Sequence, residues 1–142
     1  MNLIEHFHRN KNKYYITLIC SVALMLSTKG ITDETVISMN GDMPKYLMNG
    51  AFFYDFLKDF SFSNPVIYAY QYFARYPALS IGHHPILLGV AEVPFYALFG
   101  ISVFSARLTI IFFLLLAAIV WFQFVKQVYD ERVACISSLF LV

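Results

Sequence analysis

The chain has 142 residues, of which 59% are hydrophobic and 13% are charged, and its formal net charge is +1. Soluble domains carry about a quarter charged residues, and disordered chains combine low hydrophobicity with high net charge, so both classes are excluded. The small net charge also gives no electrostatic reason to bind nucleic acid. Cys20 and Cys135 each lie within an apolar run and are interpreted as small core residues. We therefore predict an all-α integral membrane protein with several spans.

The N-terminal segment, residues 1–13, carries three basic residues and one acidic residue. The apolar run that follows, residues 14–28, is predicted to be transmembrane helix 1, although its 15 residues fall short of the roughly 20 that a bilayer requires. Snorkelling lysines and a thinner bilayer close this gap. A secretory signal peptide is the alternative, but no clear small-x-small cleavage site follows the run. Under either interpretation, the basic residues place segment 1–13 in the cytoplasm.

Residues 29–80 are predicted to form an extracytoplasmic loop. The loop holds five acidic and four basic residues, and 12 of the 31 residues between Tyr46 and Tyr76 are Tyr or Phe. Because such amphipathic rings prefer the boundary between membrane and water, we expect the loop to lie on the bilayer surface.

Residues 81–125 carry only two formal charges, Glu92 and Arg107, and are long enough for two spans. A break at residues 100–102 divides them into predicted transmembrane helix 2 (81–100) and transmembrane helix 3 (104–125). Pro94 predicts a kink in the first of these spans. A buried carboxylate is costly in a membrane, so Glu92 is either functional or paired, or it contacts a helix outside this chain.

The last part of the chain comprises a polar connection, residues 126–132, and an apolar run, residues 133–142. Ten residues cannot cross a bilayer, so this run is predicted to begin a truncated transmembrane helix 4. Strict alternation of the spans places Arg107 inside and segment 126–132 outside. The count of basic residues does not favour this strongly, because Lys126 and Arg132 outnumber Arg107, so the positive-inside rule orients the first span well and the later ones poorly. We expect the chain to pack against further transmembrane helices of a longer protein.

Asp42 stands at the head of a predicted helix within the loop. Proline is favoured in the first turn of a helix, as Pro44 would be, and an aspartate before it caps free backbone N–H groups. The residues that follow at helical spacing, predicted to form an apolar face lying along the membrane, are Tyr46, Leu47, Gly50, Ala51, Tyr54 and Leu57. Asp42 is therefore either a helix cap or a reactive carboxylate. The rival acidic pair, Asp33 and Glu34, has no such pattern behind it.

Arg75, His83 and His84 are the candidate anion-binding residues. A guanidinium group binds phosphate with a planar fork of donors, and two histidines at the mouth of a span are further donors. The alternative is that all three residues contact lipid headgroups. A metal site is not predicted, because adjacent histidines point in different directions and no third ligand stands at a useful spacing.

Four motifs occur in an order that resembles the membrane glycosyltransferases of the protein O-mannosyltransferase and lipid A aminoarabinose transferase group. The matching residues are Asp42 and Tyr46; His84-Pro85; Leu98-Phe99-Gly100; and Ala106-Arg107-Leu108. The resemblance covers residues 31–142 and implies the N-terminal part of an enzyme with the GT-C fold (glycosyltransferase family 39-like). The chain departs from the family pattern at Met43, where many members have a second acidic residue, and at Ile86, where many have a second proline.

The resemblance implies transfer of a sugar from a polyprenyl-phosphate donor to an acceptor hydroxyl in the bacterial inner membrane. Asp42 then takes the place of the family's loop aspartate, which serves as catalytic base or lies beside the acceptor, and Tyr46 lies in the substrate site. We expect Arg75, His83 and His84 to stabilise the departing phosphate. The sequence indicates no cofactor, and it leaves open whether the reaction requires a divalent metal. We also expect the segment to be inactive alone, because one loop and three spans cannot enclose a lipid-linked donor.

The alternative is a small non-catalytic membrane subunit that packs against a larger membrane partner. A transporter fragment fits less well, because transporters place paired charges at mid-membrane.

Overall fold

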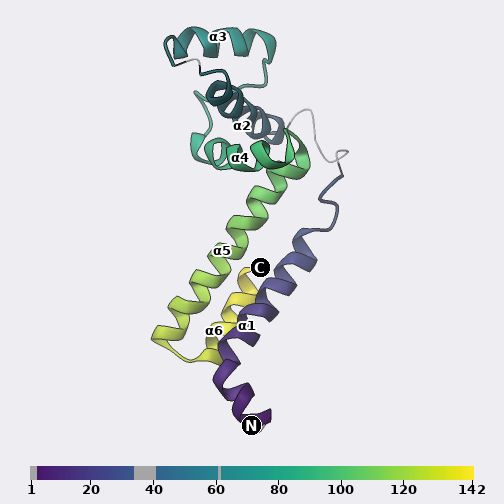
Figure 1. Ribbon diagram of the computed structural model, residues 1–142, viewed down its shortest axis with the longest axis vertical. Coiled ribbons are helices and arrows are strands. Elements are labelled where there is room, and N and C mark those ends of the chain that lie inside the picture. The colour runs from purple at the N-terminus through teal and green to yellow at the C-terminus, as the bar shows by residue number, and fades with distance from the viewer. Residues whose placement is uncertain (1–2, 34–40, 61) are drawn as a thin grey trace. The chain divides into compact units, whose positions relative to one another are not determined.

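The computed structural model describes residues 3–33, 41–60 and 62–142, with side chains from residue 11 onward. All regular secondary structure in these residues is helical, which confirms the all-α prediction. The helices are α1 (Leu3–Ser27), α2 (Met43–Lys58), α3 (Pro65–Arg75), α4 (Ile86–Phe99), α5 (Val103–Val128) and α6 (Glu131–Leu141) (Figure 1). Residues 1–2 of the predicted cytoplasmic segment, and Glu34 of the rival acidic pair, lie outside the described residues.

Among the described helices, α5 alone is both long and apolar enough to cross a membrane. Its 26 residues contain the whole of the predicted span 104–125. The 14 residues of α4 rise about 21 Å at 1.5 Å per residue, less than the roughly 30 Å of a hydrocarbon core. Helix α1 covers all of the run 14–28 except its last residue, and it begins earlier, at Leu3. The spans predicted at 14–28 and 81–100 therefore stay predictions.

The chain divides into two compact units, which are described separately. The terminal unit comprises Met1–Lys29 and Ile110–Val142, and the central unit comprises Gly30–Thr109.

The terminal unit has a core built from α1, α5 and α6. Its buried residues are Ile19, Ala118, Phe122, Val125, Ala134 and Cys135. The alanines let the helices approach closely. Cys135 is a free thiol in this core, as expected of a small core residue, and Cys20 is free and half-buried.

The basic groups of α1 and α5 lie at the same end of the terminal unit. Lys11 and Tyr15 of α1 line one pocket together with Lys126 of α5, and the Tyr15 ring lies 6.3 Å from that of Phe122. The side of the membrane on which segment 126–132 lies stays a prediction.

The predicted polar connection 126–132 is mostly helical. Helix α5 continues to Val128 and α6 begins at Glu131, so only two residues separate them. The Asp130 carboxylate makes the short turn possible, because it accepts the backbone N–H groups of Arg132 (2.7 Å) and Val133 (2.9 Å).

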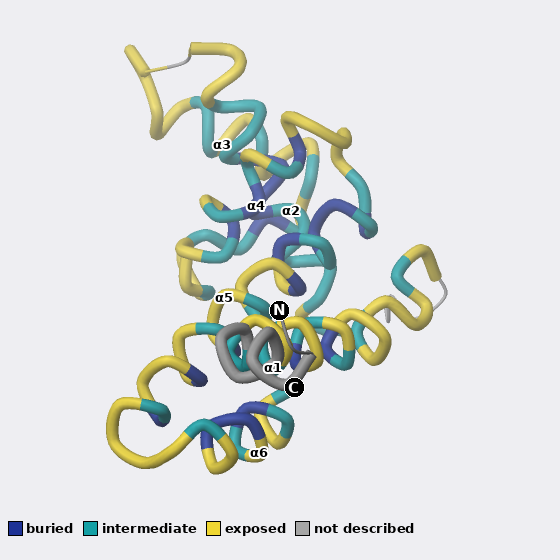
Figure 2. Tube along the Cα trace, turned by 60° about the horizontal axis from the view of Figure 1, so that its bottom comes forward, coloured by how far each residue is buried: buried dark blue, intermediate teal, exposed yellow. Residues whose placement is uncertain are grey.

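In the central unit, α2 packs closely on α4. A Cβ atom added at Gly89 would lie 3.1 Å from the backbone carbonyl carbon of Asn49, so the glycine permits this approach. Both helices carry buried residues, whereas α3 carries none (Figure 2). Of the apolar face predicted for α2, Gly50 and Ala51 are buried, but Leu57 near the helix end is exposed.

Glu92 is buried within the central unit. Its side chain is 1% exposed, and Tyr96 donates a long hydrogen bond (3.4 Å) to its carboxylate. The carboxylate also lies against Gly50, where a Cβ atom would collide with it. Helix α2 of this chain therefore covers Glu92, and no helix from outside is needed to do so.

Two tyrosines attach α3 to α2. Tyr72 donates to the Asp55 carboxylate and Tyr68 donates to the Asp59 carboxylate, both at 2.9 Å. Burial, followed by the hydrogen bond to the neighbouring carboxylate, raises the pKa of each tyrosine well above its ordinary value. Both hydroxyls therefore remain protonated donors.

Replacing Tyr72 with phenylalanine is expected to lower the free energy of unfolding by about 0.5–1.5 kcal/mol, because the Asp55 carboxylate loses its donor. Tyr70→Phe is the matched control, since Tyr70 is 72% exposed on the same helix. Chemical unfolding of both variants in detergent, followed by circular dichroism, measures the difference. Equal stability of the two variants would show that the hydrogen bond does not hold α3.

Candidate functional site

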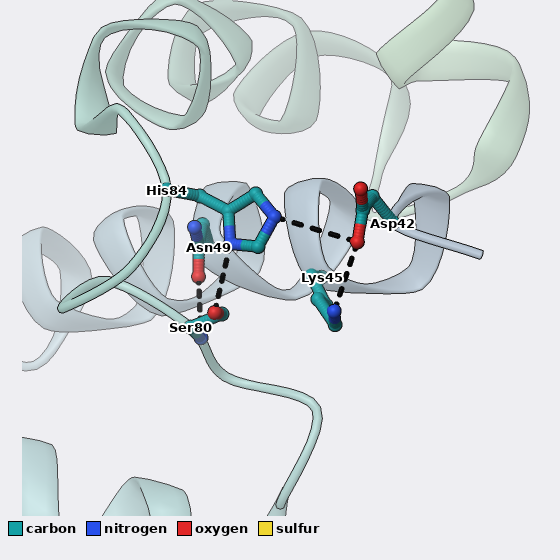
Figure 3. A network of polar contacts seen from close by, with 5 residues as sticks. All are labelled: Asp42, Lys45, Asn49, Ser80 and His84. Atoms are coloured by element: carbon teal, nitrogen blue, oxygen red, sulfur yellow. Dashed lines mark hydrogen bonds and ion pairs between the residues drawn. The ribbon is translucent and has the colours of Figure 1, made fainter. Parts of the chain in front are cut away.

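Asp42 occupies the N-cap position of α2, but its side chain does not cap the helix. Its backbone carbonyl accepts the N–H groups of Lys45 (3.0 Å) and Tyr46 (3.1 Å). The carboxylate instead accepts a hydrogen bond from Lys45 Nζ at 2.8 Å and lies 3.5 Å from His84 Nε2 (Figure 3). The interpretation of Asp42 as only a helix cap is thus wrong for its side chain.

The environment of Asp42 favours its charged form. The hydrogen bond from Lys45 is the largest influence, followed by the positive charge of Lys45, and together they hold the pKa of the carboxyl below its usual value. Because its pKa is lowered, the carboxylate is ionised at neutral pH. The side chain is 62% exposed, so the carboxylate is also open to a ligand from solution.

His84 is held by contacts on both ring nitrogens. Its Nδ1 atom lies 2.9 Å from Ser80 Oγ, and its Nε2 atom faces Asp42. The Tyr46 ring packs edge-to-face on the imidazole, with 5.0 Å between the ring centroids. The start of α2 and the loop before α4 thus bring together Asp42, Tyr46 and His84, three of the five predicted site residues.

Asn49 and Ser80 complete the network in Figure 3, and the sequence interpretation missed both. The Asn49 side chain is fully buried, and its Oδ1 atom accepts the backbone N–H of Ser80 at 2.9 Å. This bond fixes the loop that carries His84 onto α2. A signal for Asn49 was present, because positions 42, 45 or 46, and 49 lie on one face of a helix.

Arg75 and His83 do not join this network. Arg75 ends α3 and lies over the Tyr76 ring, with 5.3 Å from its guanidinium carbon to the ring centroid. His83 is exposed, and the histidine that pairs with Asp42 is its neighbour His84.

An apolar groove of about 740 Å³ lies beside the network in the central unit. Aromatic side chains of α2 and α3 form most of its walls, including Phe52, Phe53, Phe56, Tyr70 and Phe73. Ser80 and His83 lie at its polar border. Ser80 therefore belongs both to the groove and to the network that ends at Asp42.

Within the described residues, no three His, Cys, Asp or Glu side chains converge as a metal site. The expectation that no cofactor is needed stays a prediction. The chain matches no family model, no curated protein sequence and no solved structure in comparisons with known proteins.

Proposed function

We propose that the chain is part of a membrane glycosyltransferase that moves a sugar from a polyprenyl phosphate to an acceptor hydroxyl. The observation that supports this proposal is the state of Asp42: an exposed carboxylate, released from helix capping, with Lys45 and His84 beside it. One carboxylate suffices for such a transfer, whereas hydrolysis by a glycosidase usually requires two.

The proposed reaction is a single displacement at the anomeric carbon of the sugar. The bond from this carbon to the phosphate oxygen breaks, and its electron pair stays on the polyprenyl phosphate. The acceptor oxygen forms the new bond and passes its proton to the Asp42 carboxylate. Because Asp42 is exposed, the proton then leaves to water.

Lys45 and His84 are the proposed donors to the departing phosphate, whose negative charge grows in the transition state. Tyr46 and Ser80 position the His84 ring between them. The apolar groove suits the isoprenoid chain of the donor, because concave apolar sites with a few polar groups at the border are typical of ligand pockets. We further propose that His83 and Arg75 contact the donor outside the network.

The test is a transfer assay in native membranes, which supply the acceptor and any further helices. Polyprenyl phosphates that carry a tritiated hexose or pentose are added as probes. Membranes that contain the protein are expected to transfer label from one of these donors and to release free polyprenyl phosphate. Membranes from cells without the gene are expected to lose this transfer. Equal transfer in both membranes would contradict the enzyme and favour the non-catalytic subunit.

A further inference from the structure

A polar pocket of about 410 Å³ opens at one end of the terminal unit. All three helices of the unit contribute to its walls, and α6 lies beside α1 here (Figure 1). The cations and tyrosines that line it are Lys11 and Tyr15 of α1, Lys126 of α5, Arg132 of α6, and Tyr129 between α5 and α6. The proposed sugar transfer uses none of these residues.

The two carboxylates of the pocket already have partners. Glu131 pairs with Lys126 at 3.2 Å, and Asp130 is occupied by the backbone N–H groups that begin α6. Lys11 and Arg132 form no ion pair with any residue for which the structure describes side chains. The positive charge of Arg132 also contributes to the lowered pKa of Asp130, but no salt bridge joins the two side chains. Lys11 and Arg132, from different helices, thus both have donors left for an incoming anion.

The surroundings of the pocket indicate whether the anion that it would bind is a lipid headgroup or a free phosphate. The outer surfaces of α5 and α6 carry exposed apolar side chains, among them Phe124 (56% exposed) and Phe140 (89% exposed). Tyr129, at the edge of the pocket, is 70% exposed. Tyrosine and lysine beside an apolar helix surface are typical of the headgroup level of a membrane. The acyl chains of a lipid whose headgroup lies at this level can pack on the exposed apolar side chains of α5 and α6. A free phosphate gains no such contact, so a lipid is favoured.

We propose that this pocket binds the phosphate headgroup of an anionic phospholipid in the cytoplasmic leaflet, with Lys11 and Arg132 as its counter-ions. The guanidinium group supplies a planar pair of donors to the phosphate, and the lysine supplies a second charge. The cytoplasmic side follows from the basic N-terminal segment to which Lys11 belongs. The proposal rests on the proposed membrane location, but not on sugar transfer.

Native mass spectrometry of the full chain in detergent tests this site, with phosphatidylglycerol and phosphatidylcholine offered at equal concentration. The wild-type chain is expected to prefer phosphatidylglycerol. Each surface cation contributes roughly fivefold to binding of anionic lipid, so Lys11→Gln with Arg132→Gln is expected to reduce the preference about 25-fold. The matched control removes two charges outside the pocket, Lys29→Gln with Lys58→Gln, and is expected to keep the preference.

An equal loss in both double variants, or no loss in either, would overturn the site. Displacement of phosphatidylglycerol by millimolar inorganic phosphate would assign the pocket to a soluble anion and overturn the lipid. If the double variant does not fold, Lys11→Gln is compared with Lys11→Arg, and only the arginine variant is expected to keep the preference. A chain that takes up neither lipid would contradict the membrane location, an outcome distinct from a failed sugar-transfer assay.

Discussion

Asp42→Asn is expected to reduce sugar transfer by roughly a hundredfold to ten-thousandfold, the usual contribution of a general base. Asparagine has the shape of aspartate and still offers an oxygen to Lys45, but it cannot accept the proton of the acceptor hydroxyl. Affinity for the donor is expected to change little, because the proposed phosphate contacts come from Lys45 and His84. The measurement is the rate of label transfer in native membranes whose gene carries the substitution.

The matched control for this loss lies at the other end of the same helix. Asp59 is the C-cap residue of α2, and its carboxylate accepts the Tyr68 hydroxyl. Asp59→Asn makes the same chemical change, retains an oxygen for Tyr68 and is expected to transfer at the wild-type rate. If Asp42→Asn, inserted at normal levels, also transfers at that rate, then Asp42 is not the base and the proposed function fails.

The sequence predicted the helical class and the position of the long apolar helix, because uninterrupted hydropathy determines both. The predicted span 104–125 differs from α5 by only a few residues at the ends. The predicted span 81–100 rests on hydropathy alone. Helix α4 begins only after Pro85, because a proline disfavours helical backbone in the residue before it. Helices α1 and α5 also extend into the predicted segments 1–13 and 126–132, because charged residues can continue a helix.

The spacing of residues along the sequence predicts the part of the candidate site that lies on α2, but it does not predict the part that the loop before α4 contributes. Asp42 and Tyr46 share one helix, so their proximity follows from its geometry. His84 joins them only because Asn49 binds the backbone of Ser80, 31 residues along the chain. No local pattern encodes such a contact. For the same reason, the sequence predicted Arg75, His83 and His84 as equal candidates for the site, although only His84 pairs with Asp42.

The close contact of α2 with α4 leads to the largest expected loss of stability. A Cβ atom at Gly50 would overlap the Glu92 carboxylate and lie 2.8 Å from a ring carbon of Tyr96. Both side chains are almost completely buried, so neither has space to move away. Overpacking of this kind costs about 1–3 kcal/mol, and the better helix propensity of alanine returns up to about 1 kcal/mol. The net cost therefore lies between about 0 and 3 kcal/mol. Because the overlap with the buried Glu92 carboxylate is severe, we expect Gly50→Ala to fall in the upper half of this range and to lower the free energy of unfolding by about 2 kcal/mol.

Chemical unfolding in detergent, followed by far-ultraviolet circular dichroism, measures this loss, and Gly82→Ala is the control. A Cβ atom at Gly82 meets nothing within 4 Å, so this variant is expected to be as stable as the wild type. In the double variant Gly50→Ala with Glu92→Ala, the carboxylate that blocks the new methyl group is gone. The two substitutions are then expected to cost less together than the sum of their separate costs. Additive costs, or a Gly50→Ala protein as stable as the wild type, would show that α2 and α4 do not meet at this glycine.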